Sequence, residues 1–445
     1  MKKSLIALPV LIASSLTYAA EFQGPDTDFV NNAAHHAITI NNWDQGENAA
    51  STFPQAYKFT HSYKLDTNGM LPEVFDNSKR LDLDAIMVSD IEGEMSLSSF
   101  LRDRVKNHSM VVLRDNQLLH EHYWNNMNQD TPHLDMSVTK SFTSMAAQIA
   151  VAEGKLDMSK KVTDYLPEFK GTAWENATIQ QVSDMRTSVI MDVPAHQSWD
   201  NRMTTSQSYN RDGSKDYPNG ISDYFPLVTE YNAPMGKAYD YQCVNTEVLG
   251  KIVEHVTYKN LATNLEQIFQ RVGVSNDVYL MADHAGGAMA SGGLNATTKD
   301  LARIGRMLLN DGKNYLEQQV VPTAFIDSLL QGNDTVRQAW SKGKEAQLAD
   351  GWYKDQFRVL NINQHKILAM IGIHGQVLAM DKATGVVIAM NGGYPMSETP
   401  RMAISLFYKV IPAIIEAAER KKQAQPIGAY IDQDTGDLII VGESE

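Results

Sequence analysis

The position of the strand-like segments is the feature that most limits how this chain can fold. Apolar and β-branched residues cluster at 110–124 around turn residues at 114–116, and again at 367–390 around turn residues at 381–385. Between about 155 and 345 the apolar residues instead follow helical spacing or lie in loops. We therefore predict an α+β fold, in which one antiparallel sheet flanked by helices is interrupted by a helical insertion.

A Ser-x-x-Lys pair opens the most regular helical pattern in the chain. Ser137 and Lys140 are three residues apart, so they share a helix face and the lysine amine can reach the hydroxyl. Free N–H groups and the helix macrodipole favour a developing anion on the first turn. The pair therefore indicates an activated nucleophile. Gly154 stands where a C-terminal cap belongs, after apolar or small residues at helical spacing: Phe142, Met145, Ala146, Ile149 and Ala152.

A second Ser-x-x-Lys occurs at 341–344, and a chain of this length contains about one or two such patterns by chance. This copy lies in a polar stretch, with Gly343 inside it and no apolar period after it. We predict that it forms a surface loop.

Other segments suggest where a binding site could be covered. Helical spacing predicts helices at 244–256, at 297–309 and at 402–420, the last with a kink or break near Pro412. The tract 194–226 is too long for a simple connection, and long ordered loops often cover binding sites.

The first 20 residues have the pattern of a secretory signal, with Lys2 and Lys3 before an apolar run from Leu5 to Ile12. The run is short for a bilayer span, so we expect a periplasmic or secreted protein. Removal of this segment takes away two lysines and no acidic residue, and changes the formal charge from −14 to −16. Such a charge argues against nucleic acid or an anionic membrane as a partner.

The chain divides into four parts by pattern. After the signal at 1–20 we expect an N-terminal arm at 21–95, extended on the body and poor in periodic elements. The main domain is expected at 96–420, and a C-terminal hairpin or tail at 421–445. Within the main domain the α/β part is expected at about 96–155 and 345–420, and the helical part at about 156–344.

Six motifs occur in an order that resembles the penicillin-recognising serine hydrolases. This superfamily includes class C β-lactamases, D-alanyl-D-alanine carboxypeptidases, family VIII carboxylesterases and 6-aminohexanoate-dimer hydrolase. The resemblance covers about 100–420, is nearest to the amidase and esterase branch, and implies the β-lactamase/D,D-peptidase fold. The segments that carry it are Ser137–Phe142, Val162–Pro167, Asp184–Thr187, Tyr241–Gly250, Ser291–Leu294 and Gly372–Gln376.

The resemblance implies a role for each matching residue. Ser137 is similar to the acylated nucleophile and Lys140 to its base partner. Tyr241 is similar to the tyrosine of the Tyr-x-Asn motif, which passes a proton to the leaving group and helps to activate water. The backbone N–H groups of Ser137 and Ile373 are expected to form the oxyanion hole.

Two departures from the family pattern bear on the substrate. Cys243 stands where β-lactamases have asparagine. The Lys-Thr-Gly motif, whose cation holds a β-lactam carboxylate, is replaced around Gly372 by a sequence without lysine. His374 is mostly neutral at pH 7 and is a poor substitute for that cation. We expect Gly372, His374 and Cys243 to contact substrate, and little β-lactamase activity.

Competing interpretations exist for several residues. Cys243 could be a thiol nucleophile, but a small buried cysteine is commoner, and a lone cysteine allows no intrachain disulfide. His120 and His122 share a strand face, but no third metal ligand is indicated, so no metal or cofactor is expected. The segment 291–294 is interpreted as a turn beside the cleft, and 184–186 as structural.

The residues therefore predict an exported serine hydrolase that forms an acyl-enzyme on Ser137. Its expected substrates are small esters or linear amides, and the resemblance implies the carboxylesterase or 6-aminohexanoate-oligomer type. A D,D-peptidase or weak β-lactamase is the enzymatic alternative, and an inactive ligand-binding homologue is the non-enzymatic one. Whether the arm at 21–95 makes a homodimer contact is left open.

Overall fold

The computed structural model describes residues 20–423 except 79, 194–198 and 398, together with the backbone of 428–431 and 438–441. The predicted export signal, apart from residue 20, lies outside the described residues.

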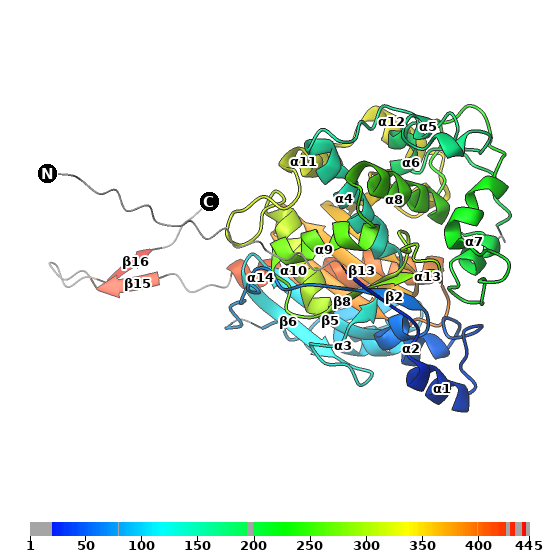
Figure 1. Ribbon diagram of the computed structural model, residues 1–445. Helices are drawn as coiled ribbons and strands as arrows, with labels where there is room; N and C mark the ends of the chain where they lie inside the picture. Colours follow the sequence, from blue (N-terminus) through cyan, green and yellow to red (C-terminus); the bar gives the residue numbers. More distant parts are fainter. Residues whose placement is uncertain are drawn as a thin grey trace, which may run out of the picture.

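A seven-stranded antiparallel sheet forms the centre of the molecule, as predicted (Figure 1). The hairpin from the first half of the chain joins the strands of the second half where β14 pairs with β5. The strands, in sheet order, are β10 (Asp350–Lys354), β11 (Phe357–Ile362), β12 (His365–Gly372), β13 (Gln376–Asp381), β14 (Val386–Gly392), β5 (Asn107–Arg114) and β6 (Gln117–Tyr123).

Both faces of this sheet are buried, which explains the nearly continuous apolar runs of its central strands. Along β14, Val387 and Ala389 belong to one core, whereas Ile388 and Met390 belong to the core on the other face. Helix α10 (Thr298–Leu309) packs against β5, β13 and β14. It comes so close that a Cβ on Gly305 would lie 2.5 Å from Val387 Cγ1. Although 297–309 falls within the predicted helical part, it therefore belongs structurally to the sheet.

The opposite face of the sheet is covered by the C-terminal helix, which consists of α13 (Pro400–Ile404), a π-helical segment (Ser405–Val410) and α14 (Ile411–Gln423). In place of the predicted kink or break near Pro412, the structure has a π-helical segment that ends just before the proline and continues into α14. Proline has no N–H and its ring clashes with the carbonyl four residues earlier, so the wider π turn just before it relieves that clash.

Helix α4 (Thr139–Ala152), which begins just after Ser137, packs against α8 (Cys243–Thr257) and α9 (Leu261–Val272). Gly154, with φ +70°, follows its C-terminus as predicted. The remaining helices of this part are α5 (Val162–Tyr165), α6 (Ile179–Ser183), α7 (Asn201–Ser206), α11 (Thr323–Gln331) and α12 (Asp334–Trp340). Short 3₁₀ turns lie at Pro167–Phe169, Gly220–Asp223, Phe225–Leu227 and Lys344–Gln347. The second Ser-x-x-Lys follows α12, with Ser341, Lys342 and Lys344 exposed, as predicted.

A second, five-stranded sheet was not predicted. Its strands, in order, are β1 (Glu21–Gln23), β2 (His61–Leu65), β8 (Val278–Ala282), β9 (Leu294–Ala296) and β7 (His133–Leu134). The strands are two to five residues long, too short to give a clear alternating pattern in the sequence. The sheet connects the N-terminal segment to the strand that precedes the nucleophile.

The segment 21–95 is more regular than the extended arm that the sequence predicts. Besides β1 and β2 it contains α1 (Thr27–His35), α2 (Asn48–Thr52), a 3₁₀ turn (Phe53–Lys58), β3 (Met87–Asp90) and β4 (Gly93–Ser96), followed by α3 (Leu97–Phe100) and a π turn (Leu101–Val105). A few buried aromatic residues, Trp43, Phe53 and Phe59, anchor it to the body. Its polar, unperiodic sequence reflects short elements that bury at most three side chains each.

The C-terminal strands β15 (Gly428–Ile431) and β16 (Leu438–Val441) form an antiparallel pair that is a sheet of its own. The hairpin predicted there is confirmed, while its turn lies outside the described residues. In the described part of the chain no helix combines the length and apolar character needed to span a bilayer.

Two buried histidines connect the two large sheets. His108 on β5 and His133 on β7 are joined by a 2.9 Å contact between Nδ1 and Nε2. Burial lowers the pKa of His108 to about 4, and it also holds the pKa of His133 well below its usual value. Both imidazoles are therefore uncharged in the folded protein at neutral pH.

This pair predicts a loss of stability in acid. A depressed histidine pKa contributes stability that is complete above about 6.5 and is lost as the pH falls towards the folded-state value. We expect His108 to account for a loss of about 1–2 kcal/mol between pH 7.5 and pH 5. Urea unfolding of the wild type and of His108→Asn at both pH values measures this contribution. Equal losses in the two proteins would contradict the prediction.

Candidate active site

Ser137 lies in a short 3₁₀ turn (Met136–Val138) that leads directly into α4. The residue before it, Met136, has φ +49°, a left-handed conformation that turns the chain sharply from β7 towards the helix. Ser137 is partly exposed whereas its neighbours are buried. The predicted position at the start of the helix is thus confirmed, with the serine projecting into a pocket.

Lys140 lies directly against the serine. Its Nζ donates to Ser137 Oγ at 2.8 Å and to the carbonyl oxygen of Ser291 at 2.6 Å, and the residue is only 1% exposed. Burial works to lower the pKa of Lys140 and is the largest single influence, but the neighbouring Cys243 and Tyr241 outweigh it and the pKa is raised. The base role was expected to require suppression of this charge. In this arrangement Lys140 is instead an ammonium that donates to the serine.

Glu247 holds in place the residue whose carbonyl binds Lys140, and the sequence analysis did not predict it. This buried carboxylate accepts from the N–H of Ala290, from the N–H of Ser291 and from Ser291 Oγ. Burial raises the pKa of Glu247, while these hydrogen bonds and the charge of Lys140 act against that rise. Glu247 thereby fixes the position of Ser291, whose carbonyl oxygen accepts the hydrogen bond from Lys140. The available signal was an acidic residue on the apolar face of the predicted helix 244–256.

Tyr241 stands just before α8, and its ring lies beside Lys140, although Tyr241 is not among the residues that line the pocket. Lys140 Nζ lies 5.2 Å from the centre of the ring. Arg358 on β11 packs on the same ring, with its guanidinium carbon 4.6 Å from the centre, and it pairs with Glu345 at 2.6 Å. Two cations therefore contact this tyrosine. Arg358 lies outside all six motifs and was not predicted.

Ile373 begins a short 3₁₀ turn (Ile373–Gly375) at the end of β12. Gly372 explains how this turn approaches the nucleophile, since a Cβ there would lie 2.6 Å from the carbonyl oxygen of Asp135 and 2.9 Å from Met136 Cβ. Only glycine allows the strand to pass so close to the serine turn. Ile373 and Ser137 consequently line the same pocket.

A buried polar network ties the two sides of this site together. Asn391 Nδ2 donates to Asp135 Oδ1 at 3.0 Å and to Gln376 Oε1 at 3.2 Å. Gln376 Nε2 in turn donates to the carbonyl oxygens of Ile373 and Gly392. The side chain that precedes the nucleophile turn is thus linked to the turn that carries Ile373. Asp135, Gln376 and Asn391 are fully buried.

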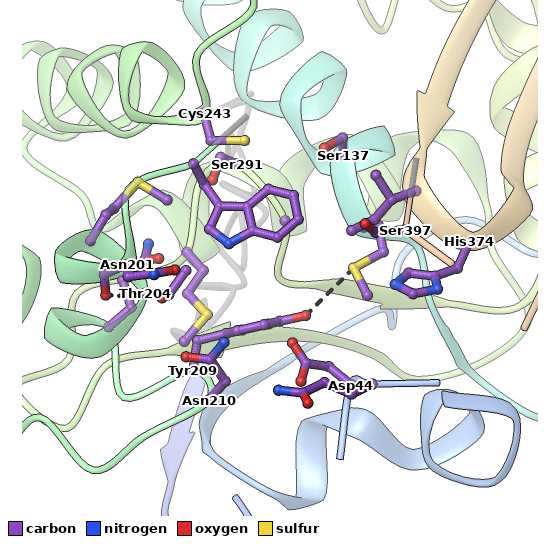
Figure 2. Close-up of a pocket in the computed structure, with 18 of the residues that line it drawn as sticks. Asp44, Ser137, Asn201, Thr204, Tyr209, Asn210, Cys243, Ser291, His374 and Ser397 are labelled. Carbon is purple, nitrogen blue, oxygen red and sulfur yellow. Dashed lines mark hydrogen bonds between the residues drawn. The ribbon is translucent and has the colours of Figure 1, made fainter. Parts of the chain in front are cut away.

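His374 and Cys243 both lie in the pocket, as predicted. His374 has φ +62°, and its Nδ1 lies 2.6 Å from the carbonyl oxygen of Tyr394. Burial lowers its pKa, so at pH 7 it is an uncharged imidazole. Cys243 lies beside Ser291 (Figure 2). Contact of either residue with substrate remains a prediction.

The pocket has a volume of about 420 Å³ and opens beside Ser137. The predicted long loop contributes one wall, including Asn201, Thr204 and Tyr209 (Figure 2). Trp199 and Met203 from the same loop also line the pocket. The N-terminal segment contributes Asp44, which sequence reasoning did not select. Nothing in a polar, unperiodic stretch distinguishes a pocket residue from a surface one.

A family model described as Beta-lactamase matches residues 97–407. The chain belongs to this β-lactamase family.

The similar proteins differ in how closely their sequences and structures match this chain. A 6-aminohexanoate-dimer hydrolase from Paenarthrobacter ureafaciens is 29% identical over 327 residues, which cover 72% of this chain and 79% of that protein. A Bacillus anthracis structure assigned to the same activity has 26% identity and a TM-score of 0.75, over 91% of this chain and all of that chain. A family VIII carboxylesterase structure shares the fold, with a TM-score of 0.54 and 14% identity over 73% of this chain and 94% of that chain.

Membership in the β-lactamase family establishes that this chain is a serine hydrolase. The individual roles of Ser137, Lys140, Tyr241 and Ile373 remain predictions that the geometry accommodates.

The other candidates lie apart from the pocket. His120 and His122 contact each other at 2.8 Å, and His122 also contacts Asn107 Oδ1. Asp184 and Arg186 form a buried ion pair. Within the described ranges, no group of three or more histidine, cysteine, aspartate or glutamate residues is placed to hold a metal ion.

The close approach at Gly372 predicts a large effect of one methyl group. In Gly372→Ala the new Cβ must push β12 away from Asp135, which shifts Ile373 relative to Ser137. We expect kcat to fall about ten- to hundredfold, since displacements near 1 Å have such effects on catalysis. Gly292→Ala is the control, because a Cβ there meets nothing within 4 Å. Steady-state kinetics that show equal effects in the two variants would contradict this account.

Proposed function

We propose that this β-lactamase-family enzyme is an exported hydrolase that forms an acyl-enzyme on Ser137 and cleaves small esters or linear amides. The observation that carries the proposal is the 2.8 Å contact between Lys140 Nζ and Ser137 Oγ at the edge of the pocket. The pattern of residues 1–20 supports export to the periplasm or the medium.

In acylation, Ser137 Oγ forms a bond to the substrate carbonyl carbon, and the bond to the leaving oxygen or nitrogen breaks. The serine proton passes to the pair formed by Lys140 and Tyr241 and from there to the leaving group. Because Lys140 rests as an ammonium, this pair must first lose one proton to become an acceptor. The N–H groups of Ser137 and Ile373 are the proposed donors to the oxyanion.

In deacylation, a water molecule attacks the acyl carbon and the bond to Ser137 Oγ breaks. The same pair takes one proton from the water and returns it to the serine. The net reaction adds one water across the ester or amide bond. No step requires a metal or a cofactor.

The charge of the pocket favours esters and linear amides over β-lactams. Among the described lining residues the only lysine is Lys140, which already binds Ser137 and Ser291, and there is no arginine. His374 is uncharged at neutral pH. A substrate carboxylate therefore finds no free cation here. Similarity to a 6-aminohexanoate-dimer hydrolase supports linear amides as substrates on separate grounds.

The proposal predicts that short-chain p-nitrophenyl esters are hydrolysed and that Ser137→Ala abolishes this, with a loss of roughly 10³-fold or more. Tyr241→Phe should lower the rate about 10²- to 10⁴-fold, since it removes a proton-transfer group. Ser341→Ala is the matched control, because it removes the serine of the exposed Ser-x-x-Lys. A chromogenic cephalosporin should be cleaved slowly.

Three results would change the conclusion. If the wild type and Ser137→Ala are equally inactive on all esters and amides tested, ligand binding becomes the better hypothesis. Stable labelling by penicillin would favour a D,D-peptidase. Rapid cephalosporin turnover would favour a β-lactamase.

The raised pKa of Lys140 also predicts the pH dependence. Because the Lys140–Tyr241 pair must lose a proton before it can accept one, kcat/KM for an unactivated ester should rise continuously from pH 7 to pH 9. The rate is corrected for spontaneous hydrolysis with Ser137→Ala. A plateau that is already reached below pH 7 would show that the pair is deprotonated at rest.

A further inference from the structure

We propose that Asp44 is a specificity-determining residue that binds a positively charged amine on the substrate. This inference rests on the proposed hydrolase function, because it concerns the same pocket. It names the substrate class more closely, as esters or linear amides that carry a protonated amine.

The first observation is an unsatisfied oxygen. Asp44 lines the pocket that opens at Ser137. Its Oδ1 is inaccessible to solvent and yet, across the described residues, accepts no hydrogen bond. Buried polar atoms are nearly always paired, and an unpaired carboxylate oxygen is costly. A donor supplied by a ligand would complete it.

The second observation is that Asp44 is held rigidly in place. The preceding residue, Trp43, is fully buried, and its Nε1 donates to the carbonyl oxygen of Tyr209 at 2.8 Å. Its ring stacks on Phe59, and its own carbonyl accepts from Thr52 Oγ1 at 2.7 Å. Since Trp43 is fixed against Tyr209, Phe59 and Thr52, the backbone that leads into Asp44 has a set position at the pocket wall. The carboxylate is a preformed feature of the wall.

The third observation is the charge balance of the pocket. Burial raises the pKa of Asp44 to about 6, against hydrogen bonds from its own backbone N–H and from the Asn210 side chain, so the carboxylate is ionised at pH 8. Both of these donors are uncharged. Lys140 is occupied by Ser137 and Ser291, and His374 is uncharged. Burial, with the charge of Asp44, holds the pKa of Tyr209 well above its usual value, so this phenol is neutral as well. Asp44 therefore presents a negative charge that the protein does not neutralise.

Asp44 lies outside the region that the family model matches, so its proposed role is separate from the chemistry that the family shares. The family model matches 97–407, whereas Asp44 belongs to the segment before it. In Figure 2, Asp44 lies across the pocket from Cys243 and Ser291, with Tyr209 nearby. A segment outside the matched region thus places a charge where a substrate must enter. The N-terminal segment therefore adds a charged group to a pocket whose other walls belong to the matched region.

The test compares esters that differ only in the charge of an amine. One pair is p-nitrophenyl 6-aminohexanoate and its N-acetyl derivative, with the amine on the acyl side. The other pair is 4-(aminomethyl)phenyl butanoate and its N-acetyl derivative, with the amine on the leaving side. At pH 8 we expect the wild type to prefer the amine in at least one pair, by roughly tenfold or more in kcat/KM, as for one charge-assisted hydrogen bond.

Asp44→Asn should reduce this preference to about twofold or less, since it keeps the shape and removes the charge. The readout is the ratio of the two rates, so a general loss of folded enzyme, which lowers both rates, does not imitate the result. Glu47→Gln is the control, because Glu47 is an exposed acid on the same segment that does not line the pocket. It should retain the full preference.

The two proposals fail in different ways. If neither these esters nor the corresponding linear amides are cleaved, the hydrolase proposal itself is wrong. If the esters are cleaved but the wild type shows no preference for the amine in either pair, the role of Asp44 is wrong while the hydrolase proposal stands. A preference that persists in Asp44→Asn would likewise overturn the assignment.

Discussion

The structure is organised around a buried ammonium group. Lys140 is almost completely shielded from water, and a charge in that position is tolerated only when its hydrogen bonds are satisfied. Ser137 and the Ser291 carbonyl accept from it, and Glu247 holds that carbonyl in place. Helices α4 and α8 and the 291–294 turn must therefore keep fixed positions. The same contacts that make the charge tolerable place it against the serine.

A second constraint is the meeting of two distant parts of the chain at the pocket. The serine turn follows a strand of the small sheet, whereas Ile373 ends a strand of the large one. Gly372 removes the steric barrier between them, and Asn391 with Gln376 supplies the hydrogen bonds across the gap. Neither sheet alone contains the site.

Much of the fold and part of the site could be predicted because their signals are local. The Ser-x-x-Lys spacing, the apolar period of α4 and the strands around two clear turns depend only on neighbouring residues. Arg358, Glu247 and Asp44 could not be assigned in the same way, since each acts through partners far away in the sequence. The five-stranded sheet was missed because its strands are too short to show a period.

The pairing of β14 with β5 also affects when the pocket can form during folding. This contact bridges the entire helical insertion, so the sheet has a high contact order and closes late in folding. A chain still in synthesis carries helix α4 long before β12 supplies the opposite side of the pocket. The complete pocket can therefore form only after both halves of the large sheet have been synthesised.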